Sequence, residues 1–278
     1  MAIVGAGDIG GATAHALASS DRVSRVLLVD AVGGAAAGKA LDIRQSGAID
    51  LFHTRLDGTD DSSRLAGCGV WVIADRVRPG EGEWRGDEAL TMLTQVMPYL
   101  GDAPLVFAGA AQSDLLAAAA TEAGIDRRRL IGSAPEALAS SVAAIVAMEA
   151  DCSPREVMLT VLGTPPAFVV PWNEASIGGY ALQQVLSQVQ LARVEARASR
   201  LWPPGPYALG AAAARVVDAL LQSSRRSCCV LTQLGGEFGV RNRPGSLPAR
   251  LGPRGIVSTR VPELTARERV QLQTSLGG

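Results

Sequence analysis

Histidine is scarce in this sequence. The 278 residues contain only His15 and His53, and both lie in the first fifth of the chain. Chemistry that needs a histidine base from the remaining four fifths is therefore excluded. Lysine is scarcer still, because Lys39 is the only lysine among 26 basic residues. We interpret that scarcity as a compositional bias.

Cysteine is also sparse, with four residues at positions 68, 152, 228 and 229 and no Cys-x-x-Cys spacing. Cys228 and Cys229 are adjacent within the apolar run SCCVL. We expect them to be buried thiols in a strand rather than metal ligands or a redox pair. The sequence therefore predicts no metal site.

Long apolar runs and an excess of charge of one sign are missing as well. No apolar stretch reaches the ~18 residues that span a bilayer, and the formal net charge is −1. Such a chain has no electrostatic reason to bind nucleic acid or an acidic membrane surface. The N-terminal residues MAIVGAG include no basic segment and no cleavage signal, so we expect a cytoplasmic protein.

The first half of the chain alternates between apolar, strand-like runs and helix-like segments. The expected strands are 2–4, 26–30, 70–74 and 105–108, and the expected helices are 10–20, 35–47, 88–100 and 114–124. This alternation predicts an α/β fold in which a parallel sheet is covered by helices on both faces.

The second half has a different pattern. Long helices are expected at 134–150, along the apolar face 182–189 and at 209–220, with short strands at 228–233, 237–240 and 255–261. A final helix is expected at 265–276, where Thr265 and Glu268 have capping-box spacing. We predict a Rossmann domain over residues 1–132 and a second domain, α+β with an antiparallel sheet, over 133–278.

A glycine-rich turn follows the first expected strand. The segment IVGAGDIGG carries Gly-x-Gly-x-x-Gly at Gly5, Gly7 and Gly10, and the next strand ends in Asp30. Gly5 allows the tight turn, Gly7 lets a pyrophosphate approach the backbone, and Gly10 permits close packing of helix on strand. Asp30 suits a ribose diol and repels a 2′-phosphate, which favours NAD over NADP. The alternative is a Rossmann turn that no longer binds a dinucleotide.

Two residues of this turn lie between the second and third glycines. Asp8 and Ile9 are included in the expected cofactor-binding segment together with the glycines. The Asp8 carboxylate would either be accommodated at the start of the helix or repel the pyrophosphate, and the sequence leaves both alternatives open.

Beyond the turn, the chain resembles the lactate/malate dehydrogenase family over nearly its whole length. The resemblance lies in IVGAGDIGGATAHAL…VLLVD, GKALDI (38–43), GEGEWR (80–85), RLIGS (129–133), VLGTPPAFVVPWNEASIGG (161–179), PYALGAAAARVVDALL (206–221) and LGGEFGV…LPARLGPRGIV (234–257). It implies NAD, a substrate domain of the lactate/malate dehydrogenase type and a dimer or tetramer. It also implies hydride transfer at C2 of a small 2-hydroxy acid.

That reaction uses a histidine base, an aspartate that holds the histidine, an arginine that clamps the substrate carboxylate and a second arginine on a mobile loop. By the resemblance, Arg85 is the loop arginine. The family's Gly-Glu-His-Gly becomes Gly-Thr-Pro-Pro, which puts Pro165 at the histidine position. Leu138 stands at the aspartate position and Ser141 at the clamp arginine. The Thr-Ala-Gly after the fourth strand has become Ala74-Asp75-Arg76, and we expect Arg76 to block the cofactor or to offset the charge of Asp8.

Three hypotheses follow from this pattern. The first is a catalytically inactive homologue that binds a nucleotide, or that pairs with another copy or a related subunit. The second is an active NAD-dependent oxidoreductase on a small hydroxy or keto acid, with a rebuilt base such as Glu174 or a bound water. The third is a structural or interaction protein without a nucleotide. The glycine turn with Asp30 argues against the third, whereas Asp8, Asp75 and Arg76 argue for it.

Overall fold

The computed structural model describes residues 1–78, 80, 82–223 and 225–277. The N-terminal half contains β1 (Ala2–Val4), α1 (Asp8–Ser19), β2 (Arg25–Val29), α2 (Gly33–Asp50), β3 (Arg55–Thr59), β4 (Trp71–Ile73), α3 (Gly86–Leu100), β5 (Leu105–Phe107), α4 (Ser113–Thr121) and β6 (Leu130–Gly132). The C-terminal half contains α5 (Ala134–Ala150), β7 (Val157–Met158), β8 (Leu162–Thr164), β9 (Ala167–Val169), β10 (Ser176–Ile177), β11 (Tyr180–Ala181), α6 (Leu182–Val185), α7 (Gln188–Ala198), α8 (Pro206–Gln222), β12 (Ser227–Gly235), β13 (Arg241–Gly252), β14 (Gly255–Thr259) and α9 (Ala266–Gly277).

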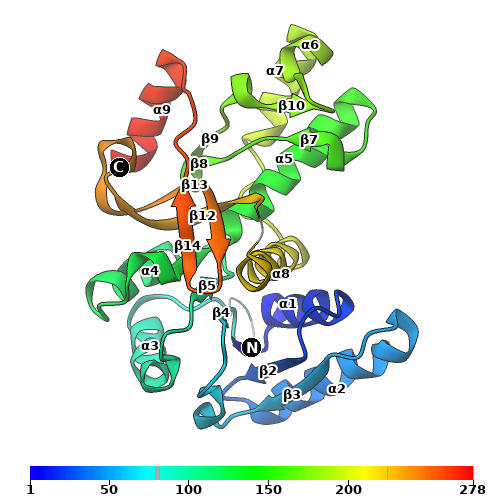
Figure 1. Cartoon of the computed structure of the whole chain (residues 1–278), viewed down its shortest axis with the longest axis vertical. Coiled ribbons are helices and arrows are strands. Elements are labelled where there is room, and N and C mark those ends of the chain that lie inside the picture. Colours follow the sequence, from blue (N-terminus) through cyan, green and yellow to red (C-terminus); the bar gives the residue numbers. More distant parts are fainter. Residues whose placement is uncertain (79, 81, 224, 278) are drawn as a thin grey trace.

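One large sheet runs through both halves of the molecule (Figure 1). Its strand order is β3-β2-β1-β4-β5-β6-β12-β13-β8-β9, with β14 paired to β13. The six strands from β3 to β6 are parallel, and from β12 onwards the pairing is antiparallel. The predicted α/β class with a parallel Rossmann-type sheet is confirmed. The pairing changes next to Gly132, whose partner across the sheet is Leu231. The division into two domains stays a prediction.

Close packing of two helices joins the halves. α8 lies beside α1, between the parallel part of the sheet and the rest of the second half (Figure 1). A Cβ atom at Gly210 would lie only 2.6 Å from the Cβ of Ala12, so glycine is needed for this approach. The apolar face of α8, which includes Leu209, Val216 and Leu220, is buried in the same core as β1.

Two predicted elements of the second half are wrong. The helical face 182–189 is split into α6 and α7, because Ser187 begins a new helix and exchanges capping hydrogen bonds with Gln190. Residues 237–240 form a turn of 3₁₀ helix rather than a strand, and Phe238 has a φ of 55°. The predicted capping box is confirmed, since Thr265 and Glu268 bond each other's backbone N–H groups.

The long strand β13 was not predicted, because Pro244 and Pro248 argue against a strand. In the structure the Pro248 carbonyl accepts from the Arg260 N–H, and the Pro244 carbonyl accepts from the Thr164 hydroxyl. The nitrogen and carbonyl of one strand residue face the same side. The nitrogens of both prolines therefore face away from β12. Their lack of an N–H group removes no hydrogen bond from the β12–β13 ladder.

The cysteines are free thiols, and Cys228 and Cys229 are buried in β12 as predicted. Burial raises the pKa of the Cys228 thiol to about 12 and raises that of Cys229 as well. Both are therefore protonated and unreactive at neutral pH. In the described part of the chain, no helix has the length and apolar character that a membrane crossing requires.

Candidate functional site

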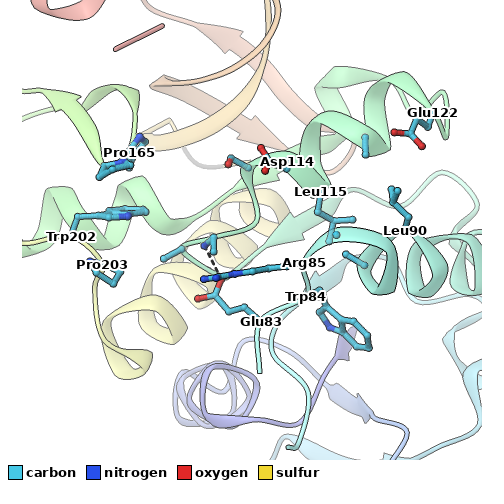
Figure 2. A pocket seen from close by; sticks show the side chains of 17 residues that line it. Glu83, Trp84, Arg85, Leu90, Asp114, Leu115, Glu122, Pro165, Trp202 and Pro203 are labelled. Atoms are coloured by element: carbon cyan, nitrogen blue, oxygen red, sulfur yellow. Dashed lines mark hydrogen bonds between the residues drawn. The ribbon is translucent and has the colours of Figure 1, made fainter. Parts of the chain in front are cut away.

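A cavity of about 610 Å³ opens beyond the C-terminal ends of β4 and β5. Its walls come from the segment after β4, from α3, from the β5–α4 segment, from α4 and from two stretches of the second half (Figure 2). Ligand sites of doubly wound folds lie at this edge of the sheet. The lining residues are Glu83, Trp84, Arg85, Gly86, Ala89, Leu90, Ala110, Ala111, Ser113, Asp114, Leu115, Ala118, Glu122, Pro165, Pro166, Trp202 and Pro203.

Arg85 and Pro165 meet in this cavity although they are far apart in the sequence. Figure 2 shows Pro165, Trp202 and Pro203 on one side, with the side chain of Arg85 extending toward them next to Glu83. Glu81, a member of the GEGEWR motif, lies outside the described residues. The structure thus brings together two positions that were assigned from separate motifs.

The turn that carries Pro165 is held on both sides. Thr164 N donates to the Ser275 hydroxyl of α9 at 2.9 Å, and the Thr164 hydroxyl donates to Pro244 O at 2.8 Å. Gly163 has a φ of 92°, which favours glycine at this position. These anchors fix the proline rings at the cavity wall and commit the Thr164 hydroxyl to a structural bond.

Leu138 and Ser141 do not line the cavity. Leu138 is fully buried in the apolar cluster against which Trp202 packs, so it lies among side chains behind the cavity wall. The Ser141 hydroxyl donates to the carbonyl of Ala137 in its own helix at 2.9 Å. Within the described residues, Arg85 is the only arginine among those that line this cavity.

Glu83 is a cavity residue that the sequence pattern did not predict. Its carboxylate accepts a hydrogen bond of 2.7 Å from Ala111 N. Burial raises the pKa of Glu83, although the N–H groups of Ala110 and Ala111 and the charge of Arg85 oppose that rise. The glutamate in GEGEWR was visible in the sequence, but nothing in the motif indicated that its side chain turns toward the β5–α4 segment.

The other titratable candidates lie elsewhere. His15 contacts Asp50 at 3.3 Å and His53 contacts Asp21 at 3.0 Å, and neither lines the cavity. The Glu174 carboxylate accepts from Arg260 at 2.8 Å and from Glu263 N at 2.6 Å. Glu174 also does not line the cavity, so the expectation of a replacement base at Glu174 has no support in this geometry.

The glycine turn is satisfied by a side chain of the protein itself. Asp75 Oδ2 accepts from Asp8 N at 2.8 Å, and Asp75 Oδ1 accepts from Gly10 N at 2.9 Å. The Asp75 carbonyl accepts from Gly7 N at 2.8 Å. A Cβ atom at Gly7 would overlap the Asp75 carboxyl group. The carboxylate therefore lies against Gly7, where the sequence predicted room for a pyrophosphate.

Asp30 is also occupied by backbone groups. Its carboxylate accepts from Ala6 N at 2.9 Å, from Val32 N at 3.0 Å and from Val77 N at 2.9 Å. Asp30 is only 5% exposed. The Val77 bond comes from the segment after β4, so a third stretch of backbone lies against this carboxylate. The role of Asp30 toward a ribose stays a prediction.

Arg76 does not fill the cofactor groove, which is the space next to Gly7 at the start of α1. Its guanidinium pairs with Glu88 and lies 4.7 Å from the centre of the Trp84 ring. Asp8 and Ile9 begin α1, and the Asp8 side chain is exposed. In this structure Asp75 takes both the space next to Gly7 and the N–H donors of Asp8 and Gly10. Of the two expectations for Arg76, neither blocking of the cofactor nor an offset of the Asp8 charge is supported, because the guanidinium lies at Glu88 and Trp84. The residue that lies against Gly7 is Asp75.

A parallel Rossmann-type sheet with a glycine turn and a cavity beyond its strand ends is typical of the class of dinucleotide-binding folds. Residues 1–103 match the family model described as lactate/malate dehydrogenase, NAD binding domain. The chain is 30% identical to a malate dehydrogenase of Thioalkalivibrio sulfidiphilus, over 100% of this chain and 96% of that protein. It therefore belongs to the lactate/malate dehydrogenase family and is, by family, an NAD-dependent oxidoreductase. These matches support NAD as a cofactor.

Solved structures agree with this assignment. The malate dehydrogenase of Salinibacter ruber superposes with a TM-score of 0.87 at 25% identity and covers 99% of this chain and 93% of that one. A lactate dehydrogenase of Cryptosporidium parvum, solved with lactic acid and β-nicotinamide adenine dinucleotide, gives a TM-score of 0.88 at 22% identity. The superposition covers 99% of this chain and 93% of the lactate dehydrogenase chain. The second likeness establishes the fold alone.

Proposed function

We propose that this family member does not transfer hydride to or from a 2-hydroxy acid, and that it acts by binding a nucleotide or a partner protein. One observation carries the proposal. Arg85 and Pro165 line the same cavity, so the alignment that assigns Pro165 to the histidine position agrees with the geometry. A proline ring has no group that can take the hydroxyl proton, and loss of a general base costs ~10²–10⁴ in rate.

The missing clamp supports the same conclusion. A bidentate grip on a substrate carboxylate needs a second guanidinium. By the resemblance, Ser141 stands at the position of that guanidinium, and its hydroxyl donates to the Ala137 carbonyl of its own helix. The cavity instead includes the carboxylates of Glu83, Asp114 and Glu122. Since like charges repel, this lining disfavours a small dicarboxylate substrate.

The test is a turnover assay with purified protein, NADH, and pyruvate or oxaloacetate, followed through the absorbance of NADH. The malate dehydrogenase of Salinibacter ruber serves as the positive control. We expect no NADH oxidation above the protein-free rate with either acid. Turnover at the rate of the control would overturn the proposal.

A second candidate function rests on Glu83. It is a partly buried carboxyl group with a raised pKa in the cavity that contains Arg85, which is the setting expected of a general acid or base. Under this alternative, the chain is an active oxidoreductase on a small hydroxy or keto acid. Any turnover found in the assay above should then disappear in Glu83→Gln. Turnover that persists in this variant would exclude Glu83 as the base.

We also propose that the chain forms a homo-oligomer or pairs with a related subunit. The family resemblance implies a dimer or tetramer, and Ile49 and Leu51 at the end of α2 are 83% and 79% exposed. Light scattering on the purified chain tests self-association. A monomer at micromolar concentration would leave pairing with a related subunit as the remaining alternative.

A further inference from the structure

We propose that Asp75 is an internal anion that occupies the phosphate-binding end of α1 and keeps dinucleotides out of the groove. The inference concerns the cofactor groove and goes beyond the proposal of lost acid–base chemistry. Of the two roles proposed above, it favours binding of a partner protein over binding of a dinucleotide. It rests on the position of one carboxylate, which is 8% exposed and lies against the glycine turn.

The backbone N–H donors at the start of α1 are already bonded to Asp75. The N-terminus of a helix binds phosphate through backbone N–H groups that have no partner within the helix. Here Asp8 N and Gly10 N donate to the two oxygens of Asp75, and Gly7 N donates to the Asp75 carbonyl. A phosphate at this position would have to displace the carboxylate from both of its hydrogen bonds.

The segment that carries Asp75 is anchored to several other parts of the fold. Val77 N bonds Asp30, Arg76 N bonds Gly82 O at 3.0 Å, and Asp75 pairs with Glu83 as an antiparallel bridge. The Arg76 side chain pairs with Glu88 of α3. Moving Asp75 out of the groove would disturb these contacts, so the carboxylate is held as part of a folded loop.

The charge of Asp75 also opposes binding of a pyrophosphate at the start of α1. The positive end of the helix dipole stabilises one anion well, and the carboxylate of Asp75 already lies there. Lys39 Nζ donates to Gly7 O at 2.8 Å and is the nearby cation of α2. Adding a pyrophosphate would bring further negative charge against a buried carboxylate, and that repulsion is strong away from water. Removing the carboxylate should therefore free the donors and leave the lysine beside them.

The experiment is calorimetric titration of NADH and of ADP-ribose into the full-length protein and three variants. Asp75→Ala frees the donors, Asp75→Asn removes the charge with little change in shape, and Asp102→Asn is the control on an exposed aspartate. We expect no saturation of the unmodified chain or of the control up to ~1 mM ligand. Asp75→Ala should bind at least tenfold more tightly, with Asp75→Asn between them.

Thermal unfolding shows whether each variant is folded, and Asp75→Asn decides the question if Asp75→Ala is not. The proposal is overturned if the unmodified chain binds NADH as tightly as the variants, or if neither variant gains affinity. Turnover of oxaloacetate is measured on the same samples. NADH binding by the unmodified chain without turnover would overturn only the proposal that Asp75 excludes dinucleotides. Turnover of oxaloacetate by Asp75→Ala would overturn only the proposal that the chain has lost its acid–base chemistry.

Discussion

Asp75 Oδ1 accepts a hydrogen bond of 2.9 Å from the backbone nitrogen of Gly10, although the two residues belong to different strand–helix units. The third glycine of the dinucleotide motif thus bonds a carboxylate of the same chain. The motif is explained by internal packing as well as by a ligand, because Gly5 and Gly7 also lie against Asp75. A glycine fingerprint alone therefore does not distinguish an open groove from a closed one.

Gly7→Ala should destabilise the protein by about 1–3 kcal/mol, since a new methyl group would overlap the Asp75 carboxyl group. Backbone strain does not contribute, because Gly7 has a φ of −70°. The cost should fall below about 1 kcal/mol in an Asp75→Ala background. Urea unfolding of the four proteins of this double-mutant cycle measures the coupling.

The matched control is Gly34→Ala, because Gly34 lies in α2 with open space around it. Alanine there should stabilise the helix by roughly 0.5–1 kcal/mol. An equal loss from Gly7→Ala in both backgrounds would contradict the contact between Gly7 and Asp75.

Replacing Gly163-Thr164-Pro165-Pro166 by Gly-Glu-His-Gly should not restore turnover of oxaloacetate. The new histidine would lack a carboxylate partner, because Leu138 is buried in an apolar cluster, and the substrate would lack its clamp at Ser141. The NADH assay measures the outcome, with circular dichroism to confirm folding. Substantial activity would mean that the assignment of the Leu138 segment is wrong.

Glu83→Gln should change how stability depends on pH. Burial raises the pKa of Glu83 in the folded protein, so the folded state binds more protons than the unfolded state between the two pKa values. The unmodified protein therefore loses stability as pH rises from the ordinary value of ~4.3 through the raised one. The variant has no titrating carboxyl group at this position. Its free energy of unfolding should therefore increase, relative to that of the unmodified protein, as pH rises over that window. Denaturant unfolding across the window measures the difference.

Glu88→Gln is a control of opposite sign. The hydrogen bond from Arg76 lowers the pKa of Glu88, so its stabilising effect is present above the ordinary pKa and disappears as pH falls. This variant should be the less stable one at neutral pH and should match the parent at low pH. Parallel curves for both variants would contradict the assigned environments.

Thr265→Ala should destabilise the protein by about 1 kcal/mol through loss of the cap of α9. The Thr265 hydroxyl accepts from Glu268 N at 3.2 Å, and Glu268 also accepts from Trp172 N at 3.2 Å. Thr274→Ala in the same helix removes only an exposed bond to Val270 O and should change stability by less than about 0.5 kcal/mol. Thermal unfolding compares the two variants.

The sequence predicted several regular elements with their bounds, but it did not predict side-chain directions. β1 and α5 have the predicted bounds, because a short apolar run and a long alanine-rich helix are determined by local composition. The family pattern singles out Asp75 and Arg76 as unusual residues, but it led us to consider blocking of the cofactor for Arg76 alone. Adjacent residues after a strand point to different sides, and only the contacts of Arg76 with Trp84 and Glu88 settle the directions.

The candidate site was predicted in the same partial way. Arg85 and Pro165 were identified by motif and meet in one cavity, whereas Glu83 was missed because its partner Ala111 lies in another segment. Such a contact depends on how β4 and β5 are placed side by side. No local pattern carries that information.

The pairing of β6 with β12 has a consequence for how the chain can be divided. A fragment that ended at Gly132 would leave β6 as an unprotected sheet edge, because the strand that covers it comes from residues 227–235. Exposed edges of this kind recruit other strands and promote aggregation. The N-terminal half is therefore a poor candidate for independent expression, and heat should unfold both halves of the intact chain in one transition.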